Sequence, residues 1–500
     1  MNYQNPVVFQ DFSDPDVIRR GDHFYMIASS FNHTPGVPVL KSVNLVDWKI
    51  IGYVFNDIPF ERFNDVCHGD GAWAPALRYY KGTYYAVIPF PDEGIYVSSC
   101  IDIDKGNWTK PWCLVSGKGL IDPCPVWIKD KAYLAIGFAK SRIGFNSCLG
   151  LYEVSQDLKT NISGDYKIIY DGHHMNPTIE GPKFNLRNGY IYIMAPAGSV
   201  KSGWQVCLRS KDINGPYEAK IVLMQNDSPI NGPHQGALID LKDDKWAFIH
   251  FQDRGCYGRI IHLQPVKWVN DWPMCGNVKD ELIAGTPVLD WDYIIDKKSN
   301  YRLETSDDFN NDELSLIWQT PANKLDGWYK LDNGLVLNCY YHDDKSYKSL
   351  NLCPNLFLTK LSYPSFKCST LVELNLVNDG DEVGLCYMGQ TYQYICVKRI
   401  DGKNHLQIKQ GEFNNDCDVV LFDSIYLNKE IEFNLNLFEK SGIGHIDQAY
   451  YQLGFNKTIF KEKYQATAGR WIGGKIGVYA KGLETGGFAR FKHYKVKEVK

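Results

Sequence analysis

The sequence has no apolar run long enough to cross a membrane. A spanning helix needs about 18 or more consecutive apolar residues, and none of the 500 residues begins such a run. The chain also has no basic stripe, since its net charge is −4 and the two signs are interspersed. Nothing therefore supplies the phosphate neutralisation that nucleic-acid binding requires. We expect neither a membrane nor a nucleic acid among its partners.

Cysteine is abundant but forms no metal-binding pattern. The fourteen cysteines include no CxxC pair and no Cys/His spacing typical of zinc. Most stand in apolar, strand-like contexts, which predicts buried thiols in a reducing compartment. The first residues show no basic region followed by an apolar stretch, as a signal peptide would. Together these features predict a cytoplasmic location.

Long amphipathic helices are absent as well, so we expect an all-β protein. A chain of 500 residues exceeds one ordinary hydrophobic core and predicts two domains. The hydrophobic share of 44% and charged share of 22% are typical of a soluble globular protein. Aromatic residues make up 14%, which suits both β-sheets and clefts in which rings stack on sugars.

A repeat occupies the first half of the chain. Five segments run from a polar or aromatic lead residue through a short apolar stretch to a polar turn and an aromatic-rich strand. Successive lead residues are 49 to 59 positions apart, and they are Asp14, Trp73, Asp122, Glu180 and His234. Short strands repeating at such a period predict a β-propeller of five blades. The first strand of each blade lines the central channel, so the five lead residues should converge at one channel mouth.

The second half follows a different pattern. Residues 334–341, 371–376 and 431–437 alternate apolar and polar side chains, as half-buried antiparallel strands do. Turn signals such as Asn378-Asp379-Gly380 separate them. We predict a five-bladed propeller over residues 1–298, a polar linker, and a concanavalin-like β-sandwich (jelly roll) over residues 302–500.

Three carboxylates at one channel mouth suit glycoside hydrolysis. That reaction needs one carboxylic acid to protonate the leaving oxygen and one carboxylate to activate water or attack the sugar. Glu180 stands among apolar neighbours that favour a protonated acid, whereas Asp14 stands in a polar Ser-Asp-Pro-Asp segment that favours an ionised base. Each carboxylate alone would be an ordinary turn residue. Their equivalent places in separate repeats favour a joint function.

These segments resemble glycoside hydrolase family 43, whose members are five-bladed propeller glycosidases that invert anomeric configuration. The resemblance rests on Ser13-Asp14-Pro15-Asp16, Ala72-Trp73-Ala74-Pro75, Gly119-Leu120-Ile121-Asp122-Pro123, Ile179-Glu180-Gly181-Pro182 and Asn231-Gly232-Pro233-His234-Gln235-Gly236, with Gly258-Arg259. The second half is similar to the sandwich appended to two-domain members of that family. This looser match rests on Asp307-Asp308-Phe309, Leu316-Ile317-Trp318 and Trp471-Ile472-Gly473-Gly474.

The resemblance implies a role for each matched residue. Asp14 would be the general base and Glu180 the general acid, with Asp122 raising the acid's pKa and fixing its orientation. In an inverting site the base and acid stand about 6.5–9.5 Å apart. The substrate-binding residues implied are Trp73, Arg259, Phe31 and Gln235.

A calcium ion is the cofactor that the resemblance implies. His234 matches the family's central histidine and would bind calcium in the channel, where water would supply most ligands. Calcium prefers oxygen ligands, so such a site would be structural and electrostatic. We expect no organic cofactor.

The motifs look most like the arabinofuranosidase branch of the family. We therefore predict an exo-acting, inverting α-L-arabinofuranosidase that acts on arabinose- or xylose-containing oligosaccharides, with β-xylosidase, or both activities together, as the alternative. A non-catalytic carbohydrate-binding protein is the alternative of another class, and the presence of all three carboxylates disfavours it. The second domain either supports the propeller and closes the pocket or binds polysaccharide, and we favour the first.

Overall fold

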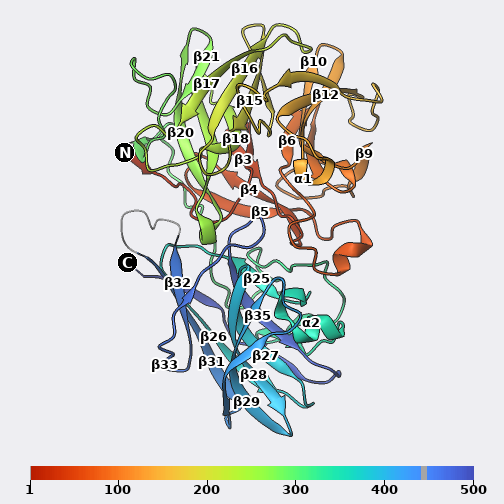
Figure 1. The fold of residues 1–500 in the computed structure, drawn as a ribbon, viewed down its shortest axis with the longest axis vertical. Helices are drawn as coiled ribbons and strands as arrows, with labels where there is room; N and C mark the ends of the chain where they lie inside the picture. Colours follow the sequence, from red (N-terminus) through yellow and green to blue (C-terminus); the bar gives the residue numbers. More distant parts are fainter. Residues whose placement is uncertain (1, 441–447, 500) are drawn as a thin grey trace.

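The computed structural model describes residues 2–440 and 448–499. These residues form two β-rich bodies, as Figure 1 shows. The strands coloured red to green form the upper body, and the cyan and blue strands form the lower body. Helix is confined, within the described residues, to α1 (Lys140–Ile143), α2 (Asp344–Lys348) and the 3₁₀ turns η1 (Glu61–Asn64), η2 (Gly255–Tyr257) and η3 (Leu350–Leu352). No described helix has the length and apolar character needed to cross a bilayer.

The upper body consists of five antiparallel four-stranded sheets. The first is β2 (Asp16–Arg20), β3 (His23–Ile27), β4 (Gly36–Ser42) and β5 (Trp48–Phe55). The second is β6 (Ala76–Tyr80), β7 (Thr83–Phe90), β8 (Gly94–Cys100) and β9 (Trp112–Ser116). The third is β10 (Leu120–Ile128), β11 (Lys131–Phe138), β12 (Cys148–Val154) and β13 (Lys167–Asp171). The fourth is β14 (Lys183–Arg187), β15 (Tyr190–Ala197), β16 (Trp204–Ser210) and β17 (Glu218–Met224). The fifth is β18 (His234–Asp240), β19 (Trp246–Asp253), β20 (Arg259–Val269) and β21 (Trp272–Cys275).

These sheets are the predicted propeller blades. The first two strands of each blade form a hairpin, and in two blades the two turn residues, Lys81-Gly82 and Asn188-Gly189, have positive φ. Two-residue turns of that kind match the twist of the flanking strands. The first strands contact one another in order, from β2 through β6, β10 and β14 to β18, and β18 contacts β2. The ring is therefore closed, and the all-β prediction for this half is confirmed.

The ring is fastened by the beginning of the chain. Strand β1 (Asn2–Gln4) pairs with β22 (Asp290–Asp292), and Val8 forms a bridge with Ile261 of β20. Tyr3 is buried and its hydroxyl donates to the carbonyl of Leu263. The segment leading to β2 is consequently held against the fifth blade.

The lower body is the predicted β-sandwich. One sheet runs β23 (Tyr329–Leu331), β24 (Leu335–Asn338), β36 (Phe488–Phe491), β26 (Phe366–Asn375), β31 (Glu430–Glu439), β32 (Ala449–Phe455) and β33 (Thr458–Ile459), with β34 (Tyr464–Gln465) on β32 and β37 (Lys495–Glu498) on β26. The other runs β25 (Phe357–Lys360), β35 (Lys475–Lys481), β27 (Glu382–Met388), β28 (Thr391–Ile400), β29 (Lys403–Glu412) and β30 (Val419–Ile425). The two inner faces enclose one apolar core.

The two bodies are joined by backbone hydrogen bonds. Thr34, in the loop before β4, exchanges both of its backbone hydrogen bonds with Thr320, at 2.9 and 2.7 Å. The backbone N–H of Gly474 donates to the carbonyl of Cys256 at 2.7 Å. These backbone bonds hold the sandwich against one mouth of the propeller channel.

Candidate active site

The strands of the propeller carry the predicted lead residues to one mouth of the channel. Asp14 precedes β2, Trp73 precedes β6, Asp122 stands at a bulge in β10, Glu180 precedes β14 and His234 begins β18. A cavity of about 630 Å³ at this mouth is lined by Asp14, Trp73, Asp122 and Glu180, together with Phe31, Gln235 and Arg259. His234 does not line the cavity but lies directly behind it, with Nε2 3.5 Å from Oε1 of Glu180. The eight predicted site residues are thus gathered within one region.

Backbone strain marks two of the carboxylates. Asp14 has φ of 57° and Asp122 has φ of 54°. Both lie in the left-handed region, which costs a non-glycine residue about 1–3 kcal/mol and persists at functional sites. The same conformation at equivalent places in two blades turns both carboxylates toward the cavity.

Asp14 is held by two polar neighbours. The Ser29 hydroxyl donates to Oδ2 of Asp14 at 2.5 Å, and Nη1 of Arg259 lies 3.4 Å from both carboxylate oxygens. The Asp14 side chain keeps only 8% of its exposure. The hydroxyl and the guanidinium hold the Asp14 carboxylate in a fixed position at the cavity, as a general base requires.

Glu180 is in the opposite situation. Burial raises its pKa to about 8, and the charges of Asp122 and Asp14 add to that effect while Arg259 opposes it. Its side chain nevertheless keeps 32% exposure, directed at the cavity. A carboxyl group that is protonated at neutral pH and open to the cavity has the properties of a general acid.

Asp122 connects the acid to the base. Its Oδ2 accepts a hydrogen bond from the backbone N–H of Gly181 at 2.9 Å, directly beside Glu180. Burial, and then the charge of Asp14, raises the pKa of Asp122 to about 6. Asp122 therefore fixes the backbone next to the acid and contributes negative charge that keeps Glu180 protonated.

The wall of the cavity is aromatic. The rings of Phe31 and Trp73 lie 6.1 Å apart, and Nε1 of Trp73 donates to the carbonyl of Gly69 at 3.0 Å. The guanidinium of Arg142, on α1, lies 5.2 Å from the Trp73 ring. Held from several sides, Trp73 presents a rigid face to a bound ligand.

Residues of the sandwich complete the wall of the cavity. None of them is among the site residues predicted from the sequence. They are Gln390, Ala468, Gly469, Trp471 and Ile472. The ring of Trp471 lies 6.1 Å from that of Trp73, edge to face. An aromatic residue within the glycine-rich run Gly469–Gly474 was the available sequence signal, because a large apolar side chain in such a loop is often a ligand contact.

His234 is fully enclosed, and this burial favours the neutral imidazole. Burial, then the charges of Arg259 and His250, lowers its pKa to about 3. Its Nδ1 is buried and has no hydrogen-bond partner among the described residues. A neutral histidine with one unused nitrogen fits a metal ligand. Across the described part of the chain, however, no three His, Cys, Asp or Glu side chains gather as a ligand set, so an ion there would depend mainly on water.

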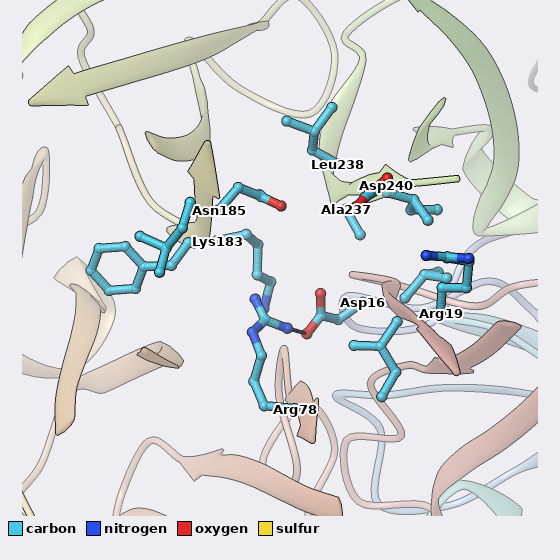
Figure 2. A pocket seen from close by; sticks show the side chains of 13 residues that line it. Asp16, Arg19, Arg78, Lys183, Asn185, Ala237, Leu238 and Asp240 are labelled. Carbon is cyan, nitrogen blue, oxygen red and sulfur yellow. Dashed lines mark hydrogen bonds and ion pairs between the residues drawn. The ribbon is translucent and has the colours of Figure 1, made fainter. Parts of the chain in front are cut away.

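The other half of the channel has a structural role. Figure 2 shows Asp16 and Arg78 facing one another, with Lys183 beside them, in a cavity of about 310 Å³. Arg78 Nη1 lies 2.6 Å from Oδ2 of Asp16, and Nη2 donates to Sγ of Cys124 at 2.9 Å. Lys183 Nζ donates to the carbonyl of Pro75 at 3.1 Å. These contacts join the first strands of four blades, namely β2, β6, β10 and β14.

Comparison with known proteins agrees with this geometry. The model of glycosyl hydrolases family 43 matches residues 3–273, and that of the beta-xylosidase C-terminal concanavalin A-like domain matches residues 306–497. A protein of Xylanibacter ruminicola named "Putative beta-xylosidase" is 32% identical over 99% of this chain and 89% of its own length.

Two further likenesses point the same way. A non-reducing end alpha-L-arabinofuranosidase of Bacteroides ovatus is 26% identical over 82% of this chain and 76% of its own. The crystal structure of a xylan beta-1,4-xylosidase from Bacillus halodurans has a TM-score of 0.84 at 20% identity, covering 99% of this chain and 100% of that one, and shows the same fold. With the carboxylates, the closed propeller and both family models in agreement, the chain belongs to glycosyl hydrolases family 43.

Proposed function

We propose that the protein is an exo-acting, inverting β-xylosidase that removes terminal xylosyl residues from xylo-oligosaccharides. The observation that carries the proposal is the pairing of a protonated Glu180 with a salt-bridged Asp14 in one cavity closed by the sandwich. The sequence motifs favoured α-L-arabinofuranosidase. The names of the relatives support xyloside instead, since β-xylosidases stand among them at 32 and 33% identity and the arabinofuranosidase at 26%.

The proposed mechanism uses the three carboxylates as follows. Glu180 donates its proton to the glycosidic oxygen as the bond from that oxygen to the anomeric carbon breaks. Asp14 accepts a proton from the water whose oxygen forms the new bond to the anomeric carbon from the opposite face. The configuration is thereby inverted. Glu180 then regains a proton from solvent and Asp14 releases one.

The sandwich supports exo action. Trp471 and Ile472 of the sandwich help to line the cavity, with the Trp471 ring beside that of Trp73, and we infer that they limit the cavity to a pocket. Part of the outer face of the six-stranded sheet is covered by η3, whose Leu350 packs in a buried cluster with Tyr392 and Tyr394, and the adjoining Ser349 hydroxyl lies 3.0 Å from that of Tyr392. A covered face favours a supporting role for this domain over polysaccharide binding. Short oligosaccharides are the substrates that fit a closed pocket, and a cytoplasmic location suits such substrates.

We include a calcium ion in the proposal, with His234 as its only protein ligand. The neutral imidazole and its unused Nδ1 fit such a role. When bound, the ion would add positive charge behind Glu180 and hold ordered water in the channel. The proton transfers above depend on the chain's own carboxylates. Removal of divalent ions with a chelator, followed by thermal melting and an activity assay, tests whether an ion contributes.

α-L-Arabinofuranosidase remains a second candidate, supported by the Bacteroides ovatus relative. The deciding experiment compares kcat/KM for 4-nitrophenyl β-D-xylopyranoside and 4-nitrophenyl α-L-arabinofuranoside. We expect a preference of at least about tenfold for the xyloside. A preference for the arabinofuranoside would overturn the substrate assignment. Proton NMR of the first-formed sugar should show inversion, and net retention would contradict the mechanism.

A further inference from the structure

Asp11 is a buried carboxylate that stands outside the cavity yet contacts three segments that build it. It is 5% exposed and lies three residues before the proposed base, Asp14. It is not among the residues that line the cavity. The mechanism above makes no use of it, and no motif of the sequence analysis assigned it a role.

The two carboxylate oxygens of Asp11 accept hydrogen bonds from different domains. Oδ1 accepts from the backbone N–H of Arg259 at 2.9 Å and from the Ser13 hydroxyl at 3.3 Å. Oδ2 accepts from the backbone N–H of Gly473 in the sandwich at 2.9 Å. One side chain thus joins the substrate-binding arginine of the propeller to the loop that carries Trp471.

The backbone around Asp11 is equally constrained. The N–H of Phe12 donates to the carbonyl of Arg259 at 3.1 Å, so Arg259 is held on both its N–H and its C=O. Lys360 of the sandwich donates from Nζ to the Asp11 carbonyl at 2.7 Å. Moving Asp11 therefore moves the segment that carries Asp14.

Close packing leaves this junction little freedom. A Cβ on Gly258 would lie 2.4 Å from Cγ of Asp11, and a Cβ on Gly473 would lie 2.7 Å from the backbone nitrogen of Gly258. The two glycines let three backbones meet around a single carboxylate. A displacement of one of these backbones should therefore shift the other two, because packed interiors transmit strain.

We propose that Asp11 is a positioning residue for glycoside hydrolysis, which sets the Arg259–Asp14 pair and the Trp471 loop relative to one another. It acts through Arg259 and Gly473 and touches no substrate itself. The sandwich thereby becomes part of the catalytic alignment rather than a passive wall. This inference deepens the proposed function, since it concerns the same site, but it holds for either pentoside.

The test is a double-mutant cycle with Asp11→Asn and Trp471→Ala. An amide replaces one acceptor oxygen with a donor NH₂ group, which cannot satisfy both backbone N–H groups. In the wild-type background we expect Asp11→Asn to lower kcat/KM for the pentoside that the wild type cleaves by about tenfold or more, since hydrogen bonds to charged groups are worth that much. Part of that loss should be a rise in KM, because the Trp471 loop is displaced, and part a fall in kcat, because Arg259 is displaced. In the Trp471→Ala background the rise in KM should be largely absent, whereas the fall in kcat should remain.

The matched control is Ser362→Ala. Ser362 accepts a hydrogen bond from Gln10, the neighbour of Asp11, at 3.1 Å across the same domain interface. This bond involves neither Arg259 nor Gly473. The kcat and KM of Ser362→Ala should therefore stay within about twofold of the wild-type values. Should Asp11→Asn fail to fold, Asp11→Glu keeps the charge and displaces it by one methylene, and the same coupling is expected.

Two results would overturn the proposal. Equal losses of kcat/KM from Asp11→Asn in both Trp471 backgrounds would show that Asp11 does not position the Trp471 loop relative to the Arg259–Asp14 pair. A loss no greater than that of Ser362→Ala would show that it has no positioning role. Both comparisons use ratios on whichever pentoside the wild type cleaves, so a wrong substrate assignment would appear in the wild-type preference and leave the cycle interpretable.

Discussion

The propeller and the sandwich each place carboxylates away from bulk water, but with different neighbours. In the propeller, three carboxylates share one cavity, those of Asp14, Asp122 and Glu180, and Arg259 forms an ion pair with Asp14. In the sandwich, the single carboxylate of Glu382 lies among three lysines. Glu382 is fully buried, with Oε2 2.5 Å from Nζ of Lys409 and Oε1 accepting from the Tyr479 hydroxyl at 2.8 Å. Lys481 and Lys398 lie 3.6 and 3.9 Å away. One domain concentrates negative charge and the other neutralises it.

The same residue type consequently has opposite properties in the two domains. Burial raises the pKa of Glu180 to about 8, and like charges add to the shift. Burial also disfavours ionisation of Glu382, but Lys409, Lys481 and Lys398 outweigh it and hold that pKa well below its usual range. Glu180 is thus protonated at neutral pH, as the proposed acid must be, while Glu382 is ionised.

Removing the base should have the largest effect. Asp14→Asn should lower kcat by about 10²–10⁴-fold, because an amide cannot accept the proton of the attacking water. The loss should be similar for substrates with good and poor leaving groups, and sugar binding measured by calorimetry should stay nearly unchanged. Substantial turnover by this variant would refute the assignment of Asp14.

Removing the acid should have an effect that depends on the leaving group. Glu180→Gln should lower kcat/KM for xylobiose by about 10²–10⁴-fold, whereas a nitrophenyl xyloside needs little protonation and should lose much less. The measurement is the ratio of the two losses in parallel assays. A loss independent of the leaving group would argue against a general acid at this position.

Glu382→Gln should affect stability instead. The buried Lys409 and Lys481 and the partly exposed Lys398 would lose their partner, and breaking such an arrangement costs about 3–5 kcal/mol of unfolding free energy. Chemical denaturation measures this, with Glu373→Gln as the control. Glu373 pairs with Arg490 at 3.0 Å but is 40% exposed, so its loss should cost less than about 1 kcal/mol.

Glu180 and Glu382 should also respond oppositely to pH. Because Glu382 has a lowered pKa, its stabilisation is present above its unfolded pKa and is lost as pH falls through the folded one. Glu180 has a raised pKa, so ionisation of the unfolded chain lowers stability as pH rises from about 4.5 to about 8. At pH 9, Glu180→Gln should therefore raise the melting temperature while Glu382→Gln lowers it. The same direction of change in both variants would contradict the comparison.

The smallest expected effect is a shift of the pH profile. The basic limb of kcat/KM should follow the pKa of Glu180 at about 8, because activity requires the protonated acid. Asp122→Asn removes a like charge and should move that limb to lower pH, besides lowering the rate. An unchanged limb would mean that Asp122 does not contribute to the proton affinity of Glu180.

Much of the catalytic mouth could be predicted from the sequence because propeller blades repeat. Asp14, Asp122 and Glu180 occupy equivalent places before or within the first strand of a blade, so their convergence follows from the repeat alone. The alternation at 371–376 and 431–437 likewise predicted β26 and β31. Trp471 could not be assigned to the cavity in this way, because it belongs to a loop of the sandwich. No local sequence pattern predicts how the sandwich docks on the propeller.

The sequence by itself determined the all-β class, the five blades, the sandwich and the identity of the acidic residues, because these depend on periodicity, turn residues and short motifs. Only the tertiary structure decided that burial raises the pKa of Glu180 to about 8, that residues of the sandwich line the cavity, and that Asp11 joins Arg259 to Gly473. These properties depend on burial and on contacts between residues hundreds of positions apart. Such contacts exist only once both domains have folded and docked.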